Sequence, residues 1–307
     1  MDVTETRIFG TCYGLFWTVR RVAVAFLMPA ETRTYGAYLR KHVQVPSSSD
    51  FFQTHPVFTR EEYARSRGGV STRTVDSLLR KHAASGRIAR VRRGLYVSVR
   101  PGTSAETVDP FLVATKAAPD AAVSHHAALQ FHGRTYSVWS QVTFFTRHAA
   151  RPFSFGPVEY VPVRPPVPVA ERPDMGGGIE VVPSAGGKAR VCTCERAMVD
   201  VLHTPALGGE WEEIWRSLQM VDFFDLDAVI AYALALDSAT TAARVGLFLE
   251  HHRQRLFVED VHLERLAAHA PKQTRYFDAR REPGRLVHPW NLIVPERVLS
   301  QSWGEVV

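Results

Sequence analysis

Arginine residues gather in one short stretch of the chain, RIARVRRGLYVSV, at residues 87–99. Arg90, Arg92 and Arg93 stand close together there, and their guanidinium groups repel one another unless anions lie beside them. The chemistry that this spacing offers is therefore the binding of a polyanion such as a phosphate backbone. The stretch predicts two short alternating strands joined at Arg93 and Gly94, since glycine supplies the positive φ of a tight hairpin.

The positive charge of the chain is concentrated in one window. Arginine outnumbers lysine by 32 to 5, which a codon bias alone could cause, but such a bias would spread arginine evenly. Residues 57–100 hold eleven basic residues against three acidic ones, a balance of +8, whereas the whole chain has a net charge of +6. The rest of the chain is thus slightly acidic at −2, and a basic window of this kind favours nucleic acid or another anionic surface.

Two helices are predicted directly before the hairpin. Thr59 and Glu62 have the spacing of a capping box, which predicts a helix over residues 60–67 that the following glycine pair ends. Ser71 is a suitable N-cap for a second helix that runs to about residue 85, before Gly86. At about 100° per residue one face of this second helix is expected to pack and the other to recognise. The packing face holds Val75, Leu78, Leu79 and His82, and the opposite face holds Arg73, Ser77 and Arg80.

Helix, glycine turn, helix and hairpin form the order of a winged helix-turn-helix. In that fold the second helix enters the major groove of double-stranded DNA, and the hairpin, or wing, contacts the backbone or the minor groove. The predicted base-reading residues at the helix start are Thr72, Arg73, Thr74 and Ser77, with Ser71 beside them. The predicted phosphate contacts are Arg80, Lys81, Arg90, Arg92 and Arg93. A winged helix kept only for protein contacts is the alternative, but it does not need the local charge.

A second unit follows the linker RPGTSAETVDP. Two helices are expected between residues 109 and 133, broken at Pro119, with the second capped by Ser124 and ended by Gly133. Strands are expected in QVTFFT, VEYVPV and IEVVP, and helices to about residue 270, including two with the N-caps Asp225 and Ser238. The fold class is therefore α+β, a winged helix-turn-helix followed by a mixed α/β domain that ends in a helical bundle. The expected divisions are an extension at 1–49, the DNA-binding domain at 50–101, a mixed part at 107–187 and a helical part at 188–300.

Metal and catalytic sites find weak support. Two sets of residues could bind zinc: His125 and His132, which would share a helical face, and Cys192, Cys194 and His203, which lie near one another in sequence. Zinc needs three or four ligands, however, and packing in the core explains each set better. If the two cysteines lie in a strand, they merely share its face. Three cysteines in all are too few for a secreted disulfide framework, which predicts a reducing, cytoplasmic location.

Enzyme motifs are missing from the sequence. A winged-helix protein with a nuclease-like carboxy-terminal domain is an alternative function, but the metal-site signature of a restriction-like domain is absent, because no lysine is preceded two positions earlier by an acidic residue. The chain also has no P-loop, no G-x-G-x-x-G and no G-x-S-x-G, and MGGGIE is better explained as a turn. We therefore expect a protein that is not an enzyme and holds no metal or cofactor.

The amino-terminal 45 residues are apolar in two stretches on either side of Arg20 and Arg21. Neither run reaches the ~18 residues of a membrane span, and the first residues lack the positive charge of a signal peptide. An upstream extension, with Met28 as the true start, is one interpretation, and a packing or membrane-proximal segment is the other. No membrane partner is expected.

Motifs along the chain resemble one known family. The predicted winged helix is followed by VSHHAALQFHG, ERAMVDVL and ARVGLFLEHHR, in an order and spacing similar to AbiEi-type antitoxins and transcriptional regulators of abortive-infection systems. The resemblance covers about residues 50–297, and a threonine usually stands where this chain has Ala197. It implies an amino-terminal domain that represses its own operon, and a carboxy-terminal domain that opposes a nucleotidyltransferase-like toxin.

The mode of DNA binding and one alternative complete the expectations. Proteins of this fold usually bind paired half-sites, so we expect a homodimer on an inverted repeat in the protein's own promoter. The alternative is a plain regulator that responds to a small ligand in the carboxy-terminal domain, where aromatic residues could line a pocket. These aromatic residues are Trp211, Trp215, Phe223, Phe224 and Phe248.

Overall fold

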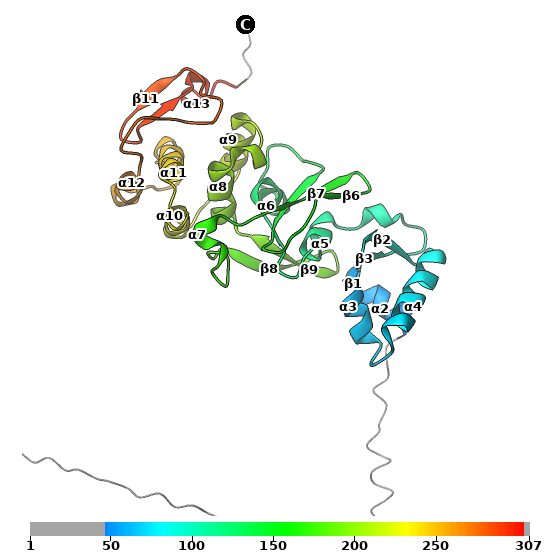
Figure 1. Cartoon of the computed structure of the whole chain (residues 1–307). Coiled ribbons are helices and arrows are strands. Elements are labelled where there is room, and N and C mark those ends of the chain that lie inside the picture. The colour runs from blue at the N-terminus through cyan, green and yellow to red at the C-terminus, as the bar shows by residue number, and fades with distance from the viewer. Residues whose placement is uncertain (1–46, 304–307) are drawn as a thin grey trace, which may run out of the picture. The chain divides into compact units, whose positions relative to one another are not determined.

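The structure is a computed structural model that describes residues 47–303, and its fold class is α+β, as expected (Figure 1). The first elements have the order of a winged helix-turn-helix. They are α2 (Ser48–Thr54), β1 (Val57–Thr59), α3 (Arg60–Ser66), α4 (Thr72–Ala84), β2 (Ile88–Arg92) and β3 (Leu95–Ser98). The three strands form an antiparallel sheet in the order β1-β3-β2. α2 and β1 are additions to the expected order, and α2 begins two residues before the expected domain start.

The local signals that predicted this unit are confirmed. The Thr59 N–H donates to Glu62 Oε2 at 2.8 Å and the Glu62 N–H donates to Thr59 Oγ1 at 3.2 Å, which is the expected capping box of α3. Ser71 Oγ accepts from the Thr74 N–H at 3.2 Å and caps α4. Gly94 has a φ of 81° at the hairpin turn, a value that a residue with a side chain adopts only with strain.

The sheet of the winged helix is covered on both faces. One face packs against the helices in a core of Phe51, Phe58, Tyr63, Val75, Leu79 and Ile88. The expected packing face of α4 is confirmed, with Val75, Leu79 and His82 buried and Leu78 partly buried. Three side chains of the other sheet face, Val57, Leu95 and Val97, are at most 4% exposed and belong to the large core of the following unit. The winged helix and the rest of the chain therefore share an apolar contact.

A six-stranded mixed sheet forms the centre of the second unit, in the order β6-β7-β5-β4-β9-β8. Its strands are β4 (Ala122–Val123), β5 (Gln141–Phe145), β6 (Phe153–Phe155), β7 (Val158–Val163), β8 (Ile179–Ser184) and β9 (Gly187–Cys192). The three expected strands are confirmed as β5, β7 and β8. The short helical elements beside the sheet are η2 (Ala105–Thr107), α5 (Pro110–Thr115), α6 (His125–Phe131) and α7 (Val167–Ala170). The break between α5 and α6 holds Pro119 and the two-residue strand β4.

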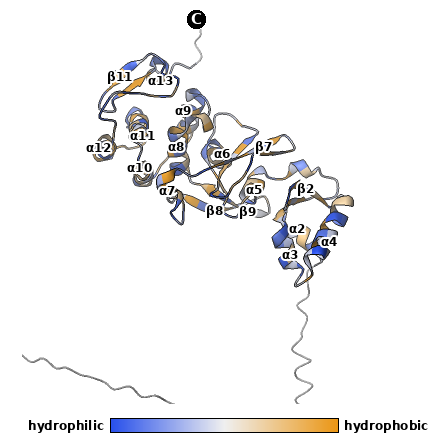
Figure 2. Ribbon diagram, viewed as in Figure 1, coloured by the Kyte–Doolittle hydropathy of each residue, from blue (hydrophilic) through white to orange (hydrophobic). Residues whose placement is uncertain are grey.

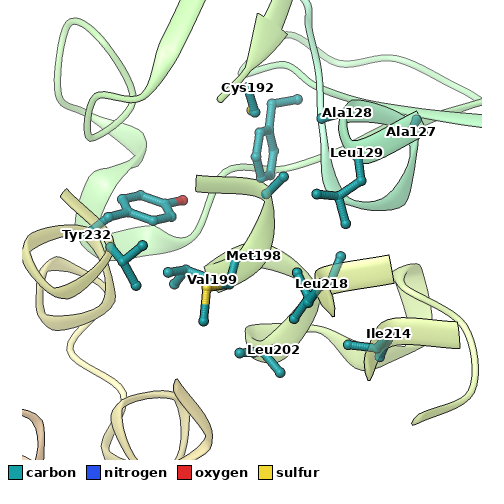
Figure 3. Packing of buried hydrophobic residues seen from close by; sticks show 14 of the residues in the cluster. Ala127, Ala128, Leu129, Cys192, Met198, Val199, Leu202, Ile214, Leu218 and Tyr232 are labelled. Atoms are coloured by element: carbon teal, nitrogen blue, oxygen red, sulfur yellow. The ribbon is translucent and has the colours of Figure 1, made fainter. Parts of the chain in front are cut away.

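Helices follow the sheet, as expected. They are α8 (Cys194–His203), η3 (Pro205–Leu207), α9 (Trp211–Gln219), α10 (Leu226–Ala235), α11 (Ala239–His251) and α12 (Asp260–Ala267). Both predicted N-caps are confirmed, since Asp225 accepts from the Ala228 N–H and Ser238 from the Thr241 N–H. Figure 3 shows Met198, Val199 and Leu202 of α8 between residues of α6, α9 and α10. α8 is thus a central element of the core.

A small three-stranded sheet follows the helices and differs from the expected helical ending. Its elements are β10 (Arg275–Tyr276), β11 (Arg285–Val287), β12 (Leu292–Val294) and the short α13 (Glu296–Leu299). Trp290 is fully buried here and lies over α11, where a Cβ added at Gly246 would be 2.1 Å from its ring. Its indole N–H donates to Glu250 Oε2 at 2.7 Å. Glycine at position 246 is therefore what lets the indole approach the helix.

One expectation about the cysteines is wrong. Cys192 and Cys194 do not share a strand face, because Cys192 ends β9, Thr193 is the N-cap, and Cys194 begins α8. The expectations about residues 1–45 and Met28 lie outside the described residues. No helix in residues 47–303 combines the length and the apolar character needed to cross a membrane.

Candidate nucleic-acid interface

Helix α4 presents a polar face to solvent. All seven residues predicted to contact DNA from this helix or its cap are exposed, namely Ser71, Thr72, Arg73, Thr74, Ser77, Arg80 and Lys81. Figure 2 shows hydrophilic residues along much of α4, while Val75 and Leu79 on its inner side are at most 2% exposed. The helix therefore has the two-sided pattern of an element that packs on one side and contacts a ligand on the other.

The polar side chains at the start of α4 differ in whether they already have a hydrogen-bond or ion-pair partner. The Ser71 and Thr74 hydroxyls lie 2.9 Å apart, and Ser71 also caps the helix, so both hydroxyls already have a partner. The side chains of Thr72, Arg73 and Ser77 form no hydrogen bond or ion pair with any residue that the structure describes. Arg73 is thus the long, charged and unpaired side chain at the start of the helix.

An ion pair fixes α3 against α4. Arg60 Nε lies 2.6 Å from Asp76 Oδ1, and the same guanidinium reaches Thr72 O at 3.4 Å. The hydrogen bond from Arg60 is the main reason why the pKa of Asp76 lies below its ordinary value. Asp76 is therefore a charged carboxylate on an otherwise basic surface, and Arg60 is its counter-ion. Arg60 and Asp76 lie sixteen residues apart on different helices, so no helical periodicity in the sequence indicated this contact.

The three arginines of the wing have different surroundings. Arg90 and Arg93 are exposed, and their side chains have no partner among residues 47–303. Arg92 is partly buried: its guanidinium donates to Ala117 O and lies 4.7 Å from the ring centre of Phe153. Burial lowers the pKa of Arg92. Arg92 thus packs against the second unit, whereas Arg90 and Arg93 extend into solvent.

Acidic residues near the interface are mostly neutralised by nearby cations. Glu62 pairs with Lys116, at the end of α5. Burial alone would raise the pKa of Glu62, but the hydrogen bonds from Lys116 and from the Thr59 N–H hold it below its ordinary value. Of the three acids in residues 57–100, Glu62 and Asp76 are therefore paired, and the unpaired arginines set the sign of the surface. Sequence reasoning did not include Lys116, because it lies outside the basic window.

The histidines considered for a metal site have other partners. His125 is buried, its Nδ1 lies 3.0 Å from Ser124 Oγ, and burial lowers its pKa to about 3. His132 Nε2 lies 2.9 Å from Cys192 O, and His203 Nδ1 lies 2.7 Å from Thr241 Oγ1. In residues 47–303, no group of three or more His, Cys, Asp or Glu side chains is arranged to hold a metal ion.

Neither cysteine near α8 is an activated nucleophile. Burial raises the pKa of the Cys192 thiol to about 12 and that of the Cys194 thiol to about 11. At neutral pH both are therefore protonated, and a thiol in that state neither attacks a substrate nor binds a metal well. The two residues act as small core side chains.

A buried polar cluster lies behind these residues, and the sequence did not reveal it. Arg196 and Asp200 are each 1% exposed, four residues apart on α8, and the Tyr232 hydroxyl donates to Asp200 at 2.8 Å. The Arg196 guanidinium also donates to Gly177 O, which ties down the glycine-rich turn of residues 174–178. The cluster is enclosed by protein, and its contacts hold α8, α10 and this turn together.

Comparison with known proteins gives one family match. Residues 49–99 match the family model described as "Transcriptional regulator, AbiEi antitoxin". The resemblance to AbiEi-type proteins is thereby confirmed for the winged helix, and the motifs further along the chain lie outside the matched residues. No curated protein sequence matches the chain significantly.

The chain is also similar to a solved structure. It is the crystal structure of the RV2827C protein from Mycobacterium tuberculosis, with 17% sequence identity and a TM-score of 0.48. The match covers 82% of this chain and 90% of that chain. A likeness at this level supports no conclusion about function.

Proposed function

We propose, from the family match of residues 49–99, that the protein is a DNA-binding transcriptional regulator with antitoxin function. The observation that carries the proposal is the polar face of α4, where Arg73 is exposed and unpaired at the start of a helix that is buried on its other side. A helix of this kind in a winged helix-turn-helix enters the major groove of DNA. The protein then acts by binding rather than by catalysis.

The residues of the interface divide into two roles. Thr72, Arg73 and Ser77 read base edges, with Ser71 and Thr74 closing the first turn of the helix. Arg80 and Lys81 on α4 and Arg90 and Arg93 on the wing contact phosphates, which sets the register of the protein on the duplex. Arg92 belongs to the same expected set, and its contacts with Ala117 O and the Phe153 ring support a second role for it, which is to hold the wing against the second unit.

The regulator acts on its own operon in this proposal. Two copies bind an inverted repeat in the promoter, with half-sites separated by one or two helical turns, on the order of 10 or 20 base pairs. The second unit opposes a nucleotidyltransferase-like toxin encoded by the neighbouring gene. The family description, antitoxin and regulator in one, supports this pairing of roles.

Two experiments in cells test the proposal. A reporter gene placed behind the protein's own promoter is expected to be repressed by the wild-type chain and released by Arg73→Ala. Arg172 is an exposed arginine of the second unit without a side-chain partner among the described residues, so Arg172→Ala is a matched control that keeps repression. Repression that is equal in all three chains would contradict the assignment of α4.

The antitoxin role is tested by co-expression. The product of the neighbouring gene is induced alone and together with this chain, and growth is measured. Restored growth on co-expression is the expected result. Growth arrest that the chain does not relieve would overturn the antitoxin role and leave a regulator only.

A further inference from the structure

Two phenylalanine residues of the second unit are exposed to solvent instead of packed in the core. Phe223, in the loop between α9 and α10, is 71% exposed, and Phe257, in the turn between α11 and α12, is 80% exposed. Their chain neighbours Phe224, Leu256 and Val258 are at most 4% exposed. The backbone of both loops is therefore anchored in the core, and each loop presents one large apolar ring to solvent.

Two contacts tie these loops to each other. Arg255 Nη1 donates to Val221 O at 2.8 Å, and Arg265 Nη1 lies 2.5 Å from Asp227 Oδ1. Each phenylalanine lies between the two contact residues of its own segment, and α10 and α12 pack side by side (Figure 1). The two exposed rings therefore belong to one surface, which we call the aromatic patch.

The backbone of Phe257 is strained. Its φ is 54°, in the left-handed region, and it ends the turn after α11 at a position where glycine is usual. The Val258 N–H donates to Arg253 O at 2.9 Å and closes this turn. A phenylalanine in that conformation is less favourable than a glycine, and its exposed ring gains no burial energy that would offset the difference. Strain that the fold does not need points to a role in binding.

Exposed acidic residues surround the aromatic patch. The segments 220–227 and 253–265 hold six acidic residues, all exposed, and only three arginines, a balance of −3 with histidine neutral. The six are Asp222, Asp225, Asp227, Glu259, Asp260 and Glu264. Two copies of such a surface repel each other, so its charge disfavours a second copy of this chain and favours a partner with a basic surface.

We infer that the aromatic patch is where the second unit binds the toxin, in a direct protein–protein contact. The inference rests on the proposed function, in which the toxin is a nucleotidyltransferase-like enzyme. An enzyme that acts on nucleotides or nucleic acid carries a basic surface for their phosphates, and such a surface complements the acidic rim of the patch. The two rings enter apolar hollows of the toxin, as aromatic anchors do at the centre of an interface. Binding there covers the basic surface and so opposes the toxin.

Calorimetric titration of the full chain with the purified product of the neighbouring gene tests the inference, together with the growth assay on co-expression. Phe223→Ser is expected to weaken binding about 30-fold, as the loss of an aromatic anchor does, and to reduce the restored growth. Phe257→Gly is expected to weaken binding similarly and, because glycine adopts a positive φ without strain, to raise the midpoint of thermal unfolding. A purely structural role would not give weaker binding together with a more stable fold.

Val167→Ser is the matched control, since Val167 is 87% exposed on α7 and lies outside both segments. If the wild type restores growth without binding the toxin, or if both phenylalanine variants bind as the control does, the inference is overturned and the antitoxin function stands. If Phe223→Ser changes only the oligomeric state of the chain, the patch belongs to a second copy and the inference is overturned as well. If the wild type neither binds the toxin nor restores growth, the antitoxin function fails too.

Discussion

Replacing Arg73 by alanine separates base reading from phosphate binding. Arg73 is exposed and its side chain has no partner in residues 47–303, so its removal leaves the free energy of unfolding nearly unchanged. Its place in the first turn of α4 is where recognition helices contact base edges. The whole effect of the substitution is therefore expected in DNA binding.

The expected loss is specific to the cognate sequence. A bidentate contact of arginine with guanine discriminates by roughly 1–3 kcal/mol, which corresponds to about 5- to 150-fold weaker binding to the promoter repeat. On a random duplex the loss is much smaller, because no base contact is made there. Relaxed specificity is expected at one base position in each half-site.

The assay is a binding titration of the wild type, Arg73→Ala and Arg172→Ala against the promoter repeat and a random duplex of the same length. Arg172→Ala removes the same charge from another surface and is expected to bind both duplexes as the wild type does. Equal losses for Arg73→Ala on the two duplexes would refute base reading and assign Arg73 to a phosphate instead.

Three further predictions concern stability. Gly246→Ala places a Cβ against the ring of Trp290 and is expected to lower the free energy of unfolding, measured in urea, by roughly 1–3 kcal/mol. In an exposed helix the same substitution would be stabilising, so an unchanged or higher urea midpoint would contradict the packing of Trp290 on α11. The pKa of Glu62 is lowered in the fold, so the stability it contributes is present above its unfolded pKa of about 4.3 and is lost as the pH falls through the folded value. The stability difference between wild type and Glu62→Gln is therefore expected to shrink below about pH 4, and a difference that grows there would refute the sign. A fragment of residues 47–101 exposes Val57, Leu95 and Val97 on the second face of its sheet, and burial of each side chain contributes roughly 1.5–3 kcal/mol to stability. The fragment is therefore expected to unfold more readily than the same residues in the full chain. Equal protection of the two in hydrogen exchange would contradict this prediction.

The winged helix could be predicted because its signals are local. Thr59 with Glu62, Ser71 with Thr74 and the glycine at position 94 each act within three or four residues, and the structure has all of them in the expected roles. The polar face of α4 follows from helical periodicity in the same way. These parts of the candidate interface therefore needed no knowledge of the tertiary structure.

Contacts between distant segments could not be predicted from such signals. Lys116 lies 54 residues beyond Glu62, and only the packing of the second unit against the winged helix brings its ammonium group to that carboxylate. The packing of Arg92 against Phe153 likewise depends on how the second unit meets the wing. The division into a DNA-binding domain at residues 50–101 and a second domain from residue 107 stays a prediction.

Short elements left no pattern to detect. β4 and β10 have two residues each, and β6, β11 and β12 have three, which is too few for an alternation of apolar and polar positions to appear. The small sheet after α12 was missed for this reason. The buried pair of Arg196 and Asp200 was missed because charged residues four apart on a helix usually lie on an exposed face.

Footprinting of the full chain on the DNA upstream of its own gene tests the central claim most directly. The account predicts an inverted repeat protected in two half-sites, on the order of 10 or 20 base pairs apart, at protein concentrations that leave random DNA unprotected. It also predicts that Arg73→Ala loses this protection while Arg172→Ala keeps it. Uniform protection without a preferred site, or no protection at all, would contradict the claim that α4 and the wing form a sequence-reading surface.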